Sequence, residues 1–168
     1  MTRALTAALA LTLAVTTVLP AQAQSARVLG EFRDWASYAA DDGTGTICFA
    51  MSKPKTTEPS AQASDEAYVY VTNRPSEDVA AEFNVVAGYT FQTGSVASVS
   101  VGSQSFPLFT QGDAAWLDDS AQAANLAAAI RAGSTLVVTG TAADGTQVTQ
   151  SYSLSGATAA QQAVGAEC

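Results

Sequence analysis

The sequence has 168 residues, of which 15 are acidic and 7 are basic, and its formal net charge at pH 7 is −8. This acidic balance argues against nucleic acid or an anionic membrane surface as a partner, because both require a concentrated basic surface. The chain contains no histidine, so it lacks the usual general base of enzymes and the commonest metal ligand.

Residues 1–23 predict a secretory signal peptide. Arg3 supplies a positive charge, residues 4–19 form an apolar run without a charged side chain, and Ala-Gln-Ala at 21–23 fits the small-x-small pattern of signal peptidase. A membrane anchor is the alternative, but the apolar run is short for a span of about 20 residues. We therefore expect cleavage between Ala23 and Gln24.

Cleavage would leave residues 24–168, which we expect to form a single domain with a core that needs no metal. Loss of Arg3 would change the net charge from −8 to −9. No later stretch is long and apolar enough to cross a bilayer. The sequence therefore predicts a periplasmic protein, with secretion or association with the outer surface as the alternatives, and no integral membrane segment after cleavage.

Cys48 and Cys168 are the two cysteines of the chain, and we expect them to form a disulfide bond. An exported protein with an even cysteine count pairs its cysteines in an oxidising compartment. Metal binding would need more ligands than these two, and a catalytic thiol would lack its usual histidine base. The bond would close nearly the whole domain into one loop and hold the C-terminus in place.

The segment from Ser52 to Glu66 predicts a mobile surface loop. It contains Pro54 and Pro59, no aromatic residue and no periodicity, a composition typical of a loop rather than of a domain boundary. We expect this loop to present a binding segment on a rigid scaffold.

Apolar and polar residues alternate with a period of two over much of the remaining chain, which predicts β-strands. Residues 67–75 carry apolar side chains on both faces, as a central strand does. Gly102-Ser103 separates two alternating runs, and Pro107 in the second run predicts an edge strand or a bulge. Asp144-Gly145 separates two further runs and is a strong hairpin signal.

Two segments predict helices. Residues 120–133 carry an apolar stripe at helical spacing, with acidic residues before it and Gly133 at its end. A second, shorter helix is expected over about 158–164. The predicted fold is therefore mostly β, an antiparallel β-sandwich or partly open barrel with one packed helix and a short C-terminal helix.

No group of residues predicts a catalytic, cofactor-binding or metal site. Ser52-Lys53-Pro54-Lys55 matches the Ser-x-x-Lys pattern of serine nucleophiles, but its accompanying motifs are missing. Asp41-Asp42-Gly43 lacks the spacing of a calcium loop and is interpreted as a turn. Asp118-Asp119 is interpreted as a helix N-terminus, because adjacent residues on a strand point to opposite faces and make poor catalytic pairs.

Two further sets of side chains bear on function. A hydrolase that uses carboxylates would require two of Asp34, Glu82, Asp113 and Asp144 to meet in a pocket. Aromatic side chains are expected mainly in the core, with a carbohydrate- or peptide-binding face built on one or two of them as the alternative. These aromatic residues are Trp35, Tyr89, Phe91, Phe106, Phe109, Trp116 and Tyr152.

Several segments from Trp35 to Cys168 form a distinctive series, in which Gly88-Tyr89, Ala115-Trp116 and Tyr152–Gly156 are the most specific. Their order and spacing resemble the invasion-associated locus B family of exported bacterial proteins. The resemblance implies a compact β-rich periplasmic or surface-associated domain, linked in pathogenic members to entry into host cells, and it implies no catalytic residues. The chain departs from the family pattern at Asp144, where a basic residue is expected, and in its few lysines and arginines.

The sequence thus predicts an exported, non-catalytic envelope or surface protein that binds an envelope or host protein and needs no cofactor. A small periplasmic inhibitor or ligand-binding β domain is the alternative, and a carboxylate hydrolase is a third possibility.

Overall fold

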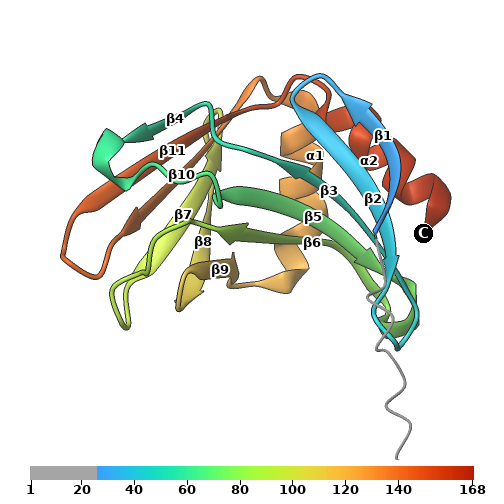
Figure 1. The fold of residues 1–168 in the computed structure, drawn as a ribbon, viewed down its shortest axis with the longest axis horizontal. Helices are drawn as coiled ribbons and strands as arrows, with labels where there is room; N and C mark the ends of the chain where they lie inside the picture. The colour runs from blue at the N-terminus through green and yellow to red at the C-terminus, as the bar shows by residue number, and fades with distance from the viewer. Residues whose placement is uncertain (1–25) are drawn as a thin grey trace, which may run out of the picture.

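The computed structural model describes residues 26–168, which form one antiparallel sheet of eleven strands with two α-helices (Figure 1). The predicted signal peptide lies outside the described residues. The strand order is β1-β2-β3-β5-β6-β9-β8-β7-β10-β11-β4, so β1 and β4 are the end strands and the sheet is not closed. The mostly β fold class with packed helices is confirmed. The strands are β1 Arg27–Phe32, β2 Trp35–Asp41, β3 Thr46–Ser52, β4 Thr56–Glu58, β5 Tyr68–Arg74, β6 Val79–Val86, β7 Val96–Val101, β8 Gln104–Gln111, β9 Ala114–Leu117, β10 Thr135–Thr141 and β11 Gln147–Ser153.

The alternation within the strands gives the sheet two chemically different faces. We call the face that packs on the helices the inner face, and the opposite one the outer face. On β5 and β6, for example, Val69, Val71, Phe83 and Val85 are buried on the inner face. In Figure 1, α1 (Ala123–Ala132) lies behind β6 and α2 (Ala157–Glu167) lies behind β1 to β3, so the viewer looks at the outer face of these strands.

Both predicted helices are present. The apolar stripe of 120–133 forms α1, whose Leu126 and Ile130 are buried, and a 3₁₀ turn over Ser120–Gln122 precedes it. The Asp119 carboxylate caps this turn by accepting a hydrogen bond from the Ala121 N–H at 3.0 Å, as expected for an N-cap residue.

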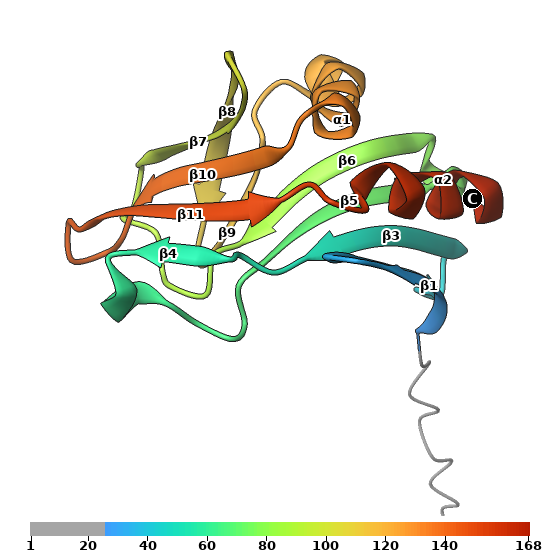
Figure 2. The same cartoon turned by 90° about the horizontal axis from the view of Figure 1, so that it is seen from above.

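The C-terminal helix α2 is longer than predicted. It spans Ala157–Glu167, and its buried positions are Ala157, Ala160 and Val164. These small residues give a weak helical pattern in the sequence, but they let α2 lie close to the sheet (Figure 2). The sequence therefore predicted too short a helix, because the packing face of α2 is mostly alanine.

Three contacts attach α2 to the first strands of the sheet. Cys168, at the end of α2, is bonded to Cys48 in β3, with their Cα atoms 6.0 Å apart. The buried Ser37 hydroxyl in β2 donates to the Ala160 carbonyl oxygen at 2.9 Å. Arg27 in β1 forms an ion pair with Glu167.

The loop predicted over residues 52–66 lies on the surface, as expected, but it is not wholly irregular. Within this segment β4 pairs with β11, so that the largely buried Thr57 lies opposite Gln150, and Ser60–Gln62 form a 3₁₀ turn. The middle of the segment is therefore part of the sheet edge. A three-residue strand is too short to show a periodicity of two, which is why the sequence pattern missed it.

Both predicted hairpins are present. Gly102-Ser103 joins β7 to β8 with Val101 opposite Gln104, and Asp144-Gly145 lies in the turn between β10 and β11. The bulge predicted at Pro107 is absent, because its pairing with β7 is regular, and the predicted edge position holds only locally, because β8 lies between β9 and β7 but has no β9 partner at Pro107. The strand tolerates the missing N–H because the β9 ladder extends only to Leu117 opposite Leu108.

Candidate interaction surface

Aromatic side chains cross the outer face of the sheet. Tyr38 on β2 lies opposite Phe49 on β3, with ring centroids 5.4 Å apart. Phe49 is 6.0 Å from Tyr70 on β5, which is 6.0 Å from Tyr68 on the same strand. Tyr70 lies opposite Met51 on one side and Asn84 on the other, so this surface continues across β6.

A second aromatic pair extends the same face. Asn84 on β6 lies opposite Trp116 on β9, which lies opposite Phe109 on β8. The rings of Trp116 and Phe109 stack with centroids 5.4 Å apart and an interplanar angle of 18°. We call this continuous surface the aromatic band, and its aromatic members are Tyr38, Phe49, Tyr68, Tyr70, Trp116 and Phe109.

The aromatic band is accessible to solvent. Phe109 is 45% exposed and neighbouring Val96 is 69% exposed, while the other aromatic members are half-buried. Both helices pack on the inner face, so neither of them covers the aromatic band (Figure 1). Partly exposed Tyr, Trp and Phe side chains are enriched in protein interfaces, where they supply most of the binding energy.

A groove of about 680 Å³ opens at the Phe109–Trp116 end of the aromatic band. It exists because β9 is short. Only Asn84–Val86 of the eight-residue strand β6 pair with β9, so the first half of β6 has β5 on one side and the groove on the other. The groove lining includes Asp78, Glu82 and Asp118, and it contains no lysine or arginine.

A smaller pocket of about 410 Å³ lies at the opposite end of the band, and its charged lining residues are Arg33, Lys53 and Lys55 together with Glu31 and Asp34. The Lys53 ammonium sits 5.1 Å from the centre of the Tyr68 ring, within range of a cation–π contact. Basic side chains are few in this chain. The linings at the two ends of the aromatic band therefore differ in the sign of their net charge.

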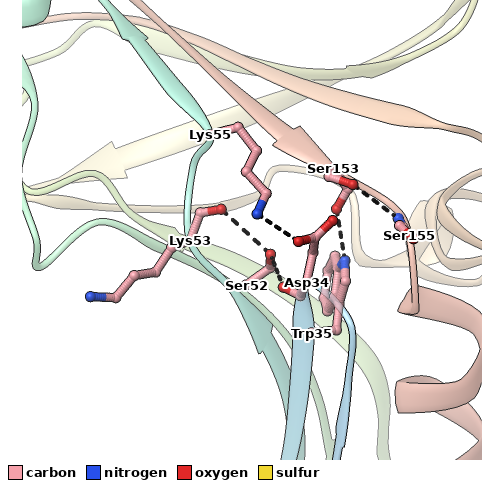
Figure 3. A network of polar contacts seen from close by, with 7 residues as sticks. All are labelled: Asp34, Trp35, Ser52, Lys53, Lys55, Ser153 and Ser155. Carbon is pink, nitrogen blue, oxygen red and sulfur yellow. Dashed lines mark hydrogen bonds and ion pairs between the residues drawn. The ribbon is translucent and has the colours of Figure 1, made fainter.

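The Ser-x-x-Lys motif does not form a nucleophile and its base. The Ser52 hydroxyl is buried and donates to the Asp34 carbonyl oxygen at 2.6 Å, and the Lys55 ammonium lies 2.5 Å from the Asp34 carboxylate (Figure 3). Lys55, followed by a hydrogen bond from Ser153, holds the pKa of Asp34 below its ordinary value. These contacts connect the β1–β2 turn to β11, where the Trp35 indole N–H also donates to the Ser153 carbonyl at 2.9 Å. The network is thus structural.

The four carboxylates considered for a hydrolase lie in separate places. Asp34 pairs with Lys55, and Glu82 pairs with Arg74. Asp113 lies in the turn between β8 and β9, and Asp144 lies in the turn between β10 and β11. The two sequence-adjacent acidic pairs also act locally: Asp41 and Asp42 accept hydrogen bonds within their own turn, and Asp119 caps a 3₁₀ turn.

Two absences hold for residues 26–168. This part of the chain has no helix that is both long and apolar enough to cross a membrane. It also has no group of three or more cysteine, aspartate or glutamate side chains placed to hold a metal ion.

The aromatic residues named from the sequence divide between the two faces. Tyr89 is half-buried, Phe109 and Trp116 belong to the aromatic band, and Trp35, Phe91, Phe106 and Tyr152 are buried. Sequence reasoning missed the other members of the band. Tyr68 and Tyr70 are two residues apart, which indicates a shared face, but their proximity to Phe49 and Tyr38 depends on strand order and register.

Comparison with known proteins agrees with the resemblance found in the sequence. The family model described as "Invasion associated locus B (IalB) protein" matches residues 35–165. The crystal structure of invasion associated protein B from Bartonella henselae is similar to this chain with a TM-score of 0.57 and 15% sequence identity, and the match covers 82% of this chain and 96% of that one. At this identity the likeness shows a shared fold. No curated protein matches the chain.

Proposed function

Because the chain belongs to the invasion-associated locus B family, we propose that it is an exported envelope or surface protein that acts by binding another protein and not by catalysis. The partner is an envelope protein or a host protein. The Cys48–Cys168 bond supports export, since such bonds persist in oxidising compartments.

The aromatic band carries this proposal. It places Trp, Tyr, Phe and Met side chains on a sheet face whose inner side is held by two helices and a disulfide bond. A rigid surface loses little conformational entropy on binding, so more of its contact energy appears as affinity. We do not propose segment 52–66 as the binding element, although the sequence suggested it, because its strand β4 is paired with β11 within the sheet.

The test is capture of partners from envelope and host-cell extracts by the oxidised protein. The variant Phe109→Ala/Trp116→Ala removes the more exposed aromatic pair. The matched control, Ser98→Ala/Thr139→Ala, truncates two half-buried residues that lie opposite one another on the outer face of β7 and β10.

We expect the aromatic double variant to weaken capture by roughly 30-fold or more, since a single hot-spot residue contributes about 2 kcal/mol. The control should bind like the wild type. Equal capture by all three proteins, with unchanged melting curves, would remove the aromatic band from the mechanism.

The groove supports a second candidate, a periplasmic inhibitor or ligand-binding β domain. Its volume of about 680 Å³ falls within the range of about 300–1,000 Å³ that is usual for small-molecule sites. A small-molecule library screened by thermal shift distinguishes the two candidates. A hit that raises the melting temperature of the wild type but not of Trp116→Ala would favour the ligand-binding domain.

Export is tested separately by sequencing the N-terminus of the protein recovered from its native host. We expect the mature chain to begin at Gln24. A membrane-retained product that still begins at Met1 would contradict both cleavage and the assignment to the periplasm.

A further inference from the structure

We propose that the groove beside Phe109 and Trp116 binds an arginine or lysine side chain from a basic segment of the partner protein. The proposal rests on the binding function argued above, and it assigns the chemistry of the contact. The cation would lie against the aromatic pair, with the carboxylates of Asp78 and Asp118 around it.

The aromatic pair provides the apolar wall of the groove. Both rings line it, and Phe109 is the large aromatic side chain most open to solvent in the part of the chain described. The rings stack on each other with a small interplanar angle, so one face of each ring is occupied by the other and the groove side of the pair is what a ligand would contact. A tryptophan face is the best aromatic partner for a guanidinium or ammonium group.

The carboxylates make the groove selective for a positive charge. Asp78, Glu82 and Asp118 line it, without a basic side chain among the lining residues. Glu82 is paired with Arg74, whereas Asp78 and Asp118 are exposed and form no ion pair within residues 26–168. Two negative charges are therefore left for a ligand, and an acidic or neutral segment would leave them unpaired.

The opposite end of the band supplies an internal comparison. Arg33, Lys53 and Lys55 line the pocket there together with Glu31 and Asp34, and Lys55 is paired with Asp34, so that end offers a cationic side chain less negative charge than the groove does. A basic segment that lies along the aromatic band should therefore bind in one direction, with its positive charge at the groove.

The test is isothermal titration calorimetry with the oxidised protein at low ionic strength. The probe is a blocked heptapeptide that contains two arginines, and its matched control contains citrulline, which is uncharged, at the same positions. The variant Asp78→Asn/Asp118→Asn removes the two free charges and keeps side-chain shape. Its matched control, Asp65→Asn/Asp144→Asn, makes the same change in net charge at two exposed positions outside the groove.

We expect the wild type to bind the arginine peptide and not the citrulline peptide. Neutralising Asp78 and Asp118 should weaken binding about 3- to 30-fold, from two exposed ion pairs. Trp116→Ala should weaken it by about 2- to 30-fold through loss of the cation–π contact. The Asp65/Asp144 control should differ little from wild type.

Three outcomes would overturn the inference. The first is equal loss of affinity in the two Asp→Asn variants, which would mean that net charge alone attracts the peptide. The second is a concentration-dependent dimer, seen by analytical ultracentrifugation, that Trp116→Ala abolishes, which would assign the groove to a second copy of this chain. The third is no peptide binding while capture of the envelope or host partner still depends on Phe109 and Trp116. That result would leave the proposed binding function intact and remove only the cationic contact.

Discussion

The outer face of the sheet has two halves that are built alike and differ in chemistry. Across β2, β3, β5, β9 and β8 it carries the aromatic band. Across β7, β10 and β11 the same outward positions are mainly hydroxyl residues, and we call them the hydroxyl face. Its members are Ser98, Ser100, Thr135, Thr139, Thr149 and Ser151; Thr139 lies opposite Ser98 and Thr149, whereas Ser100 and Ser151 lie on either side of Val137.

The difference bears on which half carries the proposed binding function. Threonine favours β-strands and exposes little apolar surface, so the hydroxyl face shows what a solvated sheet face requires. The aromatic band exposes more apolar surface than the sheet needs, and clustered exposed apolar side chains mark interaction sites on soluble proteins. We therefore assign binding to the aromatic half and structural support to the hydroxyl half.

The inner faces differ as well. Behind the aromatic half, α2 and the Cys48–Cys168 bond cover β1 to β3. Behind the hydroxyl half, the core contains a polar chain in which the Tyr152 hydroxyl donates to Gln150, whose amide donates to the Ala87 carbonyl at 2.8 Å. Each half can thus be weakened by its own substitutions.

The largest effect is expected from the disulfide bond. Cys168→Ser should lower the free energy of unfolding by roughly 4–5 kcal/mol in the chain-entropy model, because the bond closes a loop with a sequence separation of 120 residues. Denaturant unfolding measures this loss, and hydrogen exchange should show α2 and β1 to β3 losing protection before β7, β10 and β11.

Reduced wild type is the control for Cys168→Ser and should be equally destabilised. Thiol titration of the denatured, unreduced wild type should find essentially no free thiol. An unchanged melting curve for Cys168→Ser would show that the bond does not support the aromatic half.

The next effect concerns the junction of the two halves. Gly156 has a φ of +96°, and a Cβ placed there would lie 1.7 Å from the Phe32 carbonyl oxygen in the β1–β2 region. Gly156→Ala should cost about 2–4 kcal/mol, from backbone strain and the displaced contact. Thermal and denaturant unfolding measure the loss.

Gly165→Ala is the matched control for Gly156→Ala. Gly165 lies in α2, and a Cβ there would meet no atom within 4 Å, so alanine should stabilise the helix by up to about 1 kcal/mol. If Gly156→Ala were as stable as this control, close contact between β11 and the β1–β2 turn would not hold the two halves together.

A smaller stability effect sharpens the functional assignment. Phe109→Ala/Trp116→Ala should lower the free energy of unfolding by about 1–2 kcal/mol, since an aromatic pair adds about 0.5–1.5 kcal/mol beyond its buried area. The control Ser98→Ala/Thr139→Ala should change it by less than about 0.5 kcal/mol. A loss above about 3 kcal/mol would indicate that the aromatic pair belongs to the core, and would weaken its assignment to binding.

The sequence was sufficient for features that depend on local patterns. The stripe of α1, the Asp119 cap, the Gly102 and Asp144-Gly145 turns and the alternating strands all depend on neighbours a few residues away. The strand order does not follow from local patterns, because antiparallel neighbours such as β6 and β9 are separated along the chain by two other strands. The aromatic band therefore escaped prediction, since it exists only once register brings Asn84 opposite Trp116.

The strand in segment 52–66 and the full length of helix α2 were not predicted, for another reason. Their composition is polar or alanine-rich, so the apolar signal that marks buried elements is weak. Both are held by partners distant in sequence: β4 by β11, and α2 by the sheet and the Cys48 bond. Tertiary contacts decide such segments, and local propensity does not reveal them.

The last prediction concerns alkaline pH and the polar core of the hydroxyl half. Burial raises the pKa of Tyr89 to about 12 and also raises the pKa of Tyr152, which lies in the same interior. Between the ordinary tyrosine pKa of about 10 and these higher values, the unfolded chain loses protons that the folded chain keeps. The stability contributed by the neutral phenols is complete below pH 10 and is lost as the pH rises above it.

Denaturant titrations at pH 8 and pH 11 should therefore show lower stability at pH 11, and the decrease should be smaller in Tyr89→Phe, which has one fewer ionisable phenol. An equal decrease in Tyr89→Phe and wild type would show that Tyr89 is solvated, and the contrast between the polar core of this half and the disulfide-closed core of the other would then rest on Gln150 and Tyr152 alone.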